Sequence, residues 1–132
     1  YAEINGGQIS TNSRYVGLSN GTASNRVILG YGGNQSKVTC FVSSGGSTQF
    51  AGSFTVDIAI FNKVAVRYSI NNFSLWVNGV KVATDVLGAT PIGLSELSFD
   101  SGSGGQNLFG NTKDVKYYPK ALSDAELIKL TT

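Results

Sequence analysis

The dipeptide Asn78-Gly79 separates two short segments, 73–77 and 80–84, in which apolar and polar residues largely alternate. Alternation with a period of two is typical of a strand with one buried face. Asn-Gly is the strongest short signal for a two-residue hairpin turn, because that turn needs positive φ at both central positions. The chain is therefore expected to contain an antiparallel hairpin, and its fold must accommodate an antiparallel sheet.

A second two-residue turn is expected at Asn71-Asn72, because asparagine tolerates the left-handed region of φ/ψ space. It joins the hairpin to a third strand, 63–70. The predicted pairs are Ile70–Phe73, Tyr68–Leu75, Val66–Val77, Val77–Val80, Leu75–Val82 and Phe73–Thr84. The predicted core face carries Val64, Val66, Tyr68, Ile70, Phe73, Leu75, Val77, Val80 and Val82. The opposite face carries Ala65, Arg67, Ser69, Ser74, Trp76, Lys81 and Ala83.

Trp76, the only tryptophan, is thus expected on the polar face, between Arg67 on one neighbouring strand and Lys81 on the other. Two interpretations remain open. In the first, a loop or the aliphatic parts of Arg67 and Lys81 cover the indole, with a modest cation–π contribution. In the second, the indole is a flat platform for a sugar ring, and the two cations donate hydrogen bonds to its hydroxyls. The candidate carbohydrate-binding residues are therefore Trp76, Arg67 and Lys81.

The rest of the chain repeats the pattern of short alternating segments. Gly, Ser, Thr and Asn make up 54 of the 132 residues, which favours many strands joined by tight turns over long helices. Strands are predicted at 1–4, 14–19, 26–31, 37–43, 54–61, 63–70, 73–77, 80–84, 96–100 and 112–118. With no linker or repeat, the sequence predicts a single all-β domain, an antiparallel two-sheet sandwich.

One helix is predicted, at 123–130. Ser123 and Glu126 have the spacing of a capping box, and Asp124 lies near the positive end of the helix dipole. Leu127 and Leu130 are expected to dock the helix on the sandwich.

Composition excludes several classes of function. The chain has no His and one Cys, so it lacks the residues of a Ser-His-Asp or Cys-His catalytic centre. Its net charge is +2, which is too weakly basic for an electrostatic nucleic-acid binder. The eight carboxylates do not form the clustered strand motif of sandwich-fold glucanases, so no enzymatic activity is expected. No apolar run reaches the length needed for membrane insertion.

No cofactor is predicted either. Cys40 stands in an alternating segment that buries it beside Val38 and Val42, so a structural role is expected. Three aspartates have oxygen ligands suitable for calcium, but no loop shows the spacing of a calcium site; they are Asp57, Asp85 and Asp100.

Two segments resemble laminin-G-like, concanavalin-A-like jelly-roll domains. The segment 71–85, NNFSLWVNGVKVATD, is similar to a hairpin of that family, and 109–132, FGNTKDVKYYPKALSDAELIKLTT, is similar to its closing strand and helix. The C-terminal sequence YYPKALSDAELIKLTT (117–132), together with YAEI at 1–4 and NRVILGY at 25–31, most resembles domains of bacteriophage tail fibres.

The resemblance implies a jelly roll that forms the C-terminal part of a longer virion protein, in which the fibre is a homotrimer. It implies attachment to a host cell-surface glycan, and many members of the fold bind sugars on the concave sheet. Two alternatives stay open: a structural or assembly domain without a ligand of its own, and an extracellular adhesion module of a bacterial cell surface.

Overall fold

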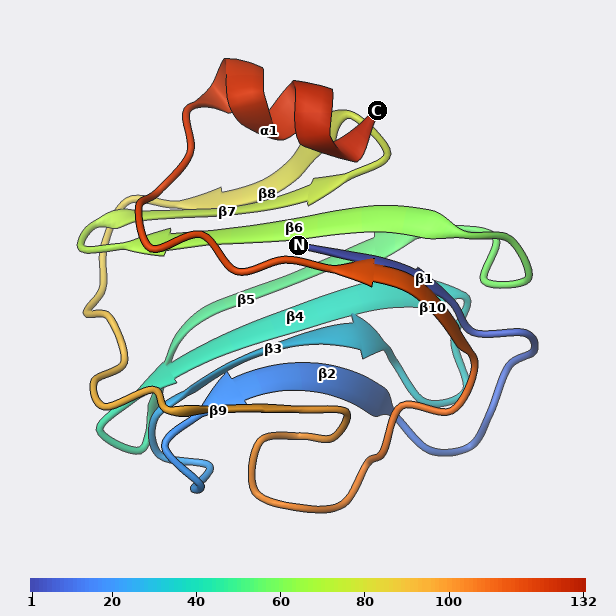
Figure 1. Cartoon of the computed structure of the whole chain (residues 1–132), viewed down its shortest axis with the longest axis horizontal. Helices are drawn as coiled ribbons and strands as arrows, with labels where there is room; N and C mark the ends of the chain where they lie inside the picture. Colours follow the sequence, from blue (N-terminus) through green and yellow to red (C-terminus); the bar gives the residue numbers. More distant parts are fainter.

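Two five-stranded antiparallel sheets face each other, and one helix lies on the outer surface of one of them (Figure 1). The computed structural model describes all 132 residues. Sheet A has the order β10-β1-β6-β7-β8, and sheet B the order β5-β4-β3-β2-β9. The strands of sheet A are β1 (Ala2–Asn5), β6 (Asn62–Ser69), β7 (Asn72–Val77), β8 (Val80–Asp85) and β10 (Asn111–Val115). Those of sheet B are β2 (Arg14–Ser19), β3 (Arg26–Tyr31), β4 (Lys37–Ser44), β5 (Ser47–Thr55) and β9 (Glu96–Ser98). The predicted jelly-roll sandwich is confirmed.

The core lies between the two sheets and consists of alternate residues from their facing strands. In β4 the side chains of Val38, Cys40 and Val42 are fully buried, opposite Leu75 and its neighbours in sheet A. Burial raises the pKa of the Cys40 thiol to about 12, so the sulfur packs as a neutral apolar group.

The Asn78-Gly79 turn has the predicted form. Asn78 has φ 48° and Gly79 has φ 83°, and Val77 pairs with Val80 across the turn. The next pair, Trp76–Lys81, also has the predicted register. Beyond it the prediction is wrong by one residue, because β8 bulges and places Ala83, instead of Val82, opposite Leu75.

The other predicted turn is also displaced. Ser69 pairs with Asn72, so the turn consists of Ile70 and Asn71, and the β6–β7 register differs from the prediction by two residues. Asn71 supplies the positive φ of this turn, 56°; its backbone N–H donates to Gly88 O, and its side chain accepts from Gly88 N. Because a shift of two residues keeps every side chain on its face, the predicted faces of β6 and β7 survive this error. Three positions are predicted wrongly: Ile70 in the turn and Val80 are exposed, and the β8 bulge turns Ala83 toward the core.

The predicted strand at 54–61 is wrong. Strand β5 instead occupies Ser47–Thr55 at the edge of sheet B, and the chain then leaves the sheet in a turn where Asp57 Oδ1 accepts the N–H of Ala59. The sequence of β5 is polar and rich in small residues, as is common for an edge strand with an exposed side. It has little apolar alternation, and for this reason the strand was not predicted.

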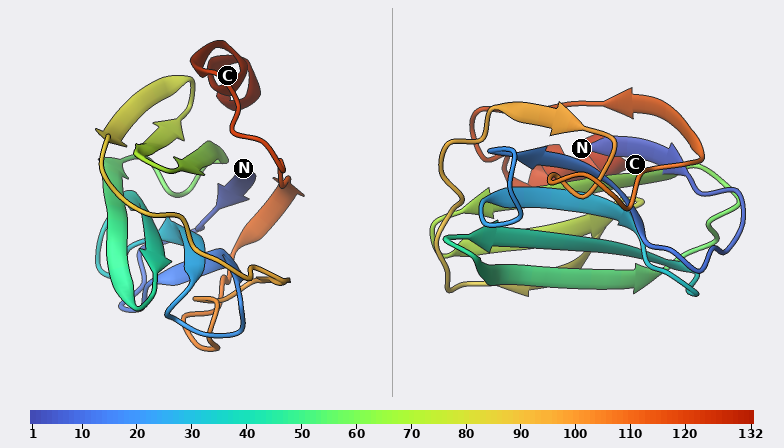
Figure 2. Two further views of the ribbon diagram at one scale, coloured as in Figure 1. Left: turned by 90° about the vertical axis from the view of Figure 1, so that its left-hand side faces the viewer. Right: turned by 90° about the horizontal axis from the view of Figure 1, so that it is seen from below.

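The helix α1 (Asp124–Thr131) begins as predicted. Ser123 Oγ accepts the N–H of Glu126, and the Glu126 carboxylate accepts the N–H of Ser123, which completes a capping box. The helix packs against β6, β7 and β8 on the outer surface of sheet A, whereas the loop 99–110 lies on the opposite side of the molecule (Figure 2).

We expect Gly79→Val to lower the free energy of unfolding by about 1 kcal/mol or more, because a β-branched residue resists positive φ. A Cβ there would also lie 3.0 Å from Thr132 Oγ1. Urea unfolding of the variant and of Val80→Thr, an exposed change in the same hairpin, measures the effect; equal stability of the two variants would contradict the turn assignment.

Candidate functional site

Trp76 lies on the predicted face of sheet A but not in solvent. Its side chain is 2% exposed and forms a second small core with Ala65 and Leu127, beneath α1. The indole Nε1 donates to Ser74 Oγ at 2.9 Å, so its polar atom is satisfied within the protein. Of the two interpretations, the exposed platform is therefore wrong. The indole is covered, as in the first interpretation, but by the helix that Leu127 was expected to dock instead of by a loop.

Lys81 pairs with Trp76 as predicted, whereas Ala65, not Arg67, lies opposite Trp76 on β6. Both cations point at the helix. Arg67 Nη1 lies 2.6 Å from Asp124 Oδ1, and Lys81 Nζ lies 2.5 Å from Asp124 Oδ2. Lys81 Nζ is also 5.3 Å from the centre of the Trp76 ring. Hydrogen bonds from Lys81 and then Arg67 hold the pKa of Asp124 below its usual range. The three predicted residues are brought together, and what they bind in this structure is the first turn of α1.

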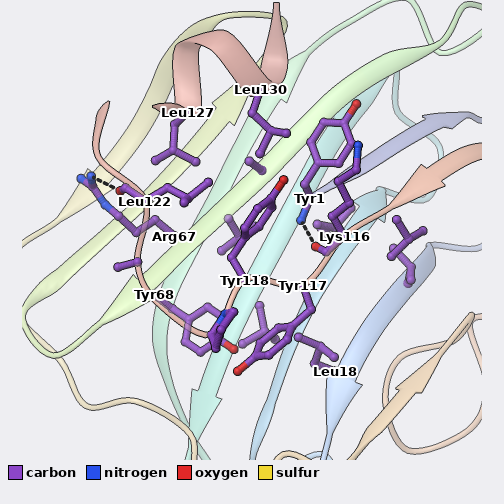
Figure 3. Close-up of a pocket in the computed structure, with 18 of the residues that line it drawn as sticks. Tyr1, Leu18, Arg67, Tyr68, Lys116, Tyr117, Tyr118, Leu122, Leu127 and Leu130 are labelled. Atoms are coloured by element: carbon purple, nitrogen blue, oxygen red, sulfur yellow. Dashed lines mark hydrogen bonds between the residues drawn. The ribbon is translucent and has the colours of Figure 1, made fainter. Parts of the chain in front are cut away.

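An apolar cavity of about 160 Å³ opens at the side of the sandwich beside β6. One wall is the connection between β10 and α1, residues 116–122, here called the strap (Figure 3). Of the twenty-one residues that line the cavity, sixteen are hydrophobic. The hydroxyls of Tyr68 and Tyr117 lie side by side at its mouth, and burial raises the pKa of Tyr68 to about 12. We call this space the edge cavity; its lining suits apolar side chains better than a polyhydroxylated ring.

The outer surface of sheet B offers different chemistry. Its strands β2, β3 and β4 bow toward sheet A at their centres, so this surface is concave along the strands (Figure 1). Two rows of residues cross it from β2 to β5. The rows are Tyr15, Gly30, Thr39 and Ser53, and Gly17, Ile28, Phe41 and Ala51. We call these two rows the concave face.

The loop 99–110 covers the β2 side of the concave face. Arg26 Nη1 donates to Ser101 O at 2.7 Å, and a Cβ on Gly17 would lie 3.1 Å from Asp100 O. Tyr15 and Ile28 are consequently buried. On the β4–β5 side Thr39 and Phe41 are partly exposed, and Ala51 and Ser53 are exposed.

Phe41 is the accessible aromatic ring of this surface. Its centroid lies 6.3 Å from that of Tyr15, edge to face at 84°, which fixes the ring. Small Ala51 beside it leaves the ring uncovered on that side, and Thr39 Oγ1 lies 3.4 Å from Tyr15 Oη. An apolar ring bordered by hydroxyls is suited to a sugar, which presents C–H groups on one face and hydroxyls at its edges.

The signal for this surface was present in the sequence. The alternation in KVTCFVS that buries Val38, Cys40 and Val42 necessarily places Thr39 and Phe41 on the opposite face. We assigned Val38, Cys40 and Val42 to the core but did not consider Thr39 and Phe41 as part of a binding surface.

The aspartates considered for calcium serve turns instead. Asp57 Oδ1 accepts from Ala59 N, Asp85 Oδ1 from Leu87 N, and Asp100 Oδ1 from Gly102 N. No three His, Cys, Asp or Glu side chains converge in a way that would hold a metal ion. Helix α1 does not combine the length and apolar character required to cross a bilayer.

We expect Trp76→Ala to lower the free energy of unfolding by about 3–5 kcal/mol, the range for truncating a buried aromatic side chain. Phe54→Ala, which truncates a ring that is 42% exposed, is the control and should cost far less. Denaturant unfolding measures both. A change below about 1 kcal/mol for Trp76→Ala would mean that α1 does not cover the indole in solution.

The Asp124 contacts predict a pH dependence of α1 docking. Because the folded pKa of Asp124 is lowered, its contribution is present above the unfolded value of 3.8 and is lost as the pH falls through the lower, folded value. The stability difference between the parent and Asp124→Asn should thus be constant near neutral pH and shrink below about pH 4. Urea unfolding at several pH values tests this; a difference that does not change with pH would contradict it.

Comparison with known proteins agrees with the fold. A family model described as the concanavalin A-like lectin/glucanases superfamily matches residues 4–128. The Ruminococcus gnavus IT-sialidase CBM40 bound to α2,3-sialyllactose is similar in structure, with a TM-score of 0.77 and 19% identity over 99% of this chain and 80% of that chain. A second structure of that CBM40 gives a TM-score of 0.70 and 20% identity over 99% and 79% of the two chains. A search of curated proteins finds no significant match. Because the match of 4–128 spans nearly the whole chain, the protein belongs to the concanavalin A-like lectin/glucanases superfamily, as the resemblance of its hairpin and closing segment implied.

Proposed function

We propose that this domain is a non-catalytic carbohydrate-binding module that holds a glycan on the concave face. The observation that carries the proposal is the fixed, partly exposed ring of Phe41, bordered by the hydroxyls of Thr39 and Ser53 on the β4–β5 side of the concave face, which the loop 99–110 leaves exposed. The ring accepts the apolar face of a sugar, and the hydroxyls exchange hydrogen bonds with water for hydrogen bonds with the ligand.

The family and the fold support this proposal. The superfamily includes lectins, and the similar CBM40 structure is bound to sialyllactose. Hydrolysis of a glycosidic bond requires two carboxylates on either side of that bond. The two rows of the concave face carry no carboxylate, which favours binding without catalysis.

The resemblance of the C-terminal segment 117–132 to tail-fibre domains supports a more specific proposal. We propose that the domain belongs to a bacteriophage tail fibre, that the fibre is a homotrimer on the virion, and that the glycan lies on the host surface. An extracellular bacterial adhesion module would use the same face in the same way. A domain that serves only fibre assembly would bind no glycan and would change its mass in light scattering when its surface is altered.

The test is a glycan array followed by titration of the best ligand, for the parent and for Phe41→Ala. We expect Phe41→Ala to weaken binding at least about tenfold, since stacking on an aromatic ring is lost along with about 1.4 kcal/mol or more of binding free energy. Phe54→Ala is the matched control, because Phe54 stands next to Ser53 in β5 but points to the other face. Thermal unfolding shows that all variants are folded at the temperature of the titration.

Two results would overturn the assignment of the face. Binding that is unchanged in Phe41→Ala excludes the concave face. Binding that is lost in Lys81→Ala and kept in Phe41→Ala would instead locate the glycan at Trp76, Arg67 and Lys81, which requires α1 to move away.

A further inference from the structure

The accessible part of the concave face is a strip two strands wide. Loop 99–110 covers its β2 side, where Tyr15 and Ile28 are buried, and β5 is the outer strand of sheet B on its other side. Adjacent strands lie about 4.8 Å apart, so the strip formed by β4 and β5 is about 10 Å across, whereas it continues along both strands. A chain of linked sugars therefore fits this strip along the strands better than across them.

Lys37 stands at one end of the strip. Residues 37, 39 and 41 alternate with the core residues of β4, so Lys37 shares the outer face with Thr39 and Phe41. It pairs with Thr55, in the row next to Thr39 and Ser53. Lys37 is partly buried, as expected of a lysine whose aliphatic part lies against a sheet while its ammonium stays in water.

The Lys37 ammonium has no carboxylate partner within the chain. The four ion pairs of the molecule use other cations, namely Arg67, Lys81, Lys113 and Lys116. A lysine on an edge strand can prevent the association of sheets, but β4 lies between β3 and β5 and has no free edge. The position of Lys37 therefore needs another explanation.

The concave face itself carries no negative charge. Two carboxylates follow strands of sheet B, but each serves its own turn: Asp57 Oδ1 accepts from Ala59 N at 2.9 Å, and Asp100 Oδ1 accepts from Gly102 N at 2.6 Å. At the end of sheet B away from Lys37, Arg26 adds a second cation. A surface with cations and no carboxylate favours an anionic ligand.

The charge and the aromatic ring are separated along the strip. Lys37 and Phe41 are four residues apart on one strand, so their Cα atoms lie about 13 Å from each other. Thr39 and Ser53 lie between them. A sugar stacked on Phe41 would have its neighbour over these two hydroxyls, and an anionic group on that neighbour would meet Lys37.

We propose that the glycan of the concave face is a linear acidic oligosaccharide that lies along β4 and β5, with one sugar on Phe41 and a carboxylate or sulfate of the next sugar at Lys37. This inference rests on the proposed function and specifies its ligand. Phe41 stacks on any sugar with an apolar face, whereas Lys37 selects for charge.

The test is an array of neutral, carboxylated and sulfated oligosaccharides, in which the two acidic arms distinguish the anions. The best acidic ligand and its neutral form, carboxyl-reduced or desulfated, are then titrated. We expect the parent to prefer the acidic form and Lys37→Met to narrow this preference about threefold to fivefold at low ionic strength, the size of an exposed ion pair. Lys129→Met, which removes an exposed lysine from α1 on the other sheet, is the matched control for net charge and should keep the preference.

Two further measurements report the direction of the ligand. Affinity should rise from the acidic monosaccharide to the disaccharide, because the second sugar reaches the second contact. Amide chemical shifts of Lys37, Thr39 and Phe41 should change on binding, and that of Gly17, beneath loop 99–110, should not.

The inference fails, and the proposed function stands, when Phe41→Ala weakens binding but acidic and neutral forms bind the parent equally. It fails in the same way when Lys37→Met keeps the full preference for the acidic form. An acidic monosaccharide that binds as tightly as its disaccharide, or a shift of Gly17 as large as that of Thr39, contradicts the placement along the strands. A parent that binds no glycan, or binding that Phe41→Ala leaves unchanged, contradicts the proposed function itself.

Discussion

Each strand of a two-sheet sandwich buries one of its faces against the partner sheet, and the alternation of side chains decides which face that is. In this chain fifteen buried residues occupy the space between the sheets, so every other residue of the strands must lie on an outer surface. The molecule therefore has two outer surfaces that need separate explanations. Helix α1 covers one of them around Trp76, and part of the other, around Phe41, stays accessible.

The fold was largely predictable because the face assignment tolerates register errors of an even number of residues. The β6–β7 pairing differs from the prediction by two residues, and an even shift leaves Val66 and Leu75 in the core and Trp76 outside it. The Ser123 capping box is a local interaction and was predicted for the same reason. Strand β5 was not found, because an edge strand is stabilised by hydrogen bonds to β4 and needs few apolar residues of its own.

The candidate site was harder to predict, because periodicity identifies the face of a residue but not what packs on it. Nothing near Trp76 in the sequence shows that a helix fifty residues later covers the indole. That packing depends on Leu127 meeting Ala65 and on Asp124 reaching both Arg67 and Lys81, contacts between distant segments. The three residues were correctly placed on one face, where Arg67 and Lys81 share the carboxylate of Asp124 and Trp76 packs on Leu127 of the same helix.

The concave face and the edge cavity present different parts of the polypeptide. On the concave face the backbone of β4 is paired on both sides, so only side chains such as Phe41 and Thr39 are available for recognition. Beside β6 the backbone itself is available, and the adjoining walls are apolar. A sugar needs dispersed hydroxyl partners and one flat ring, the combination that Phe41, Thr39 and Ser53 present. The apolar lining of the edge cavity lacks it, and this difference in side-chain chemistry is why the concave face is the better candidate for a glycan.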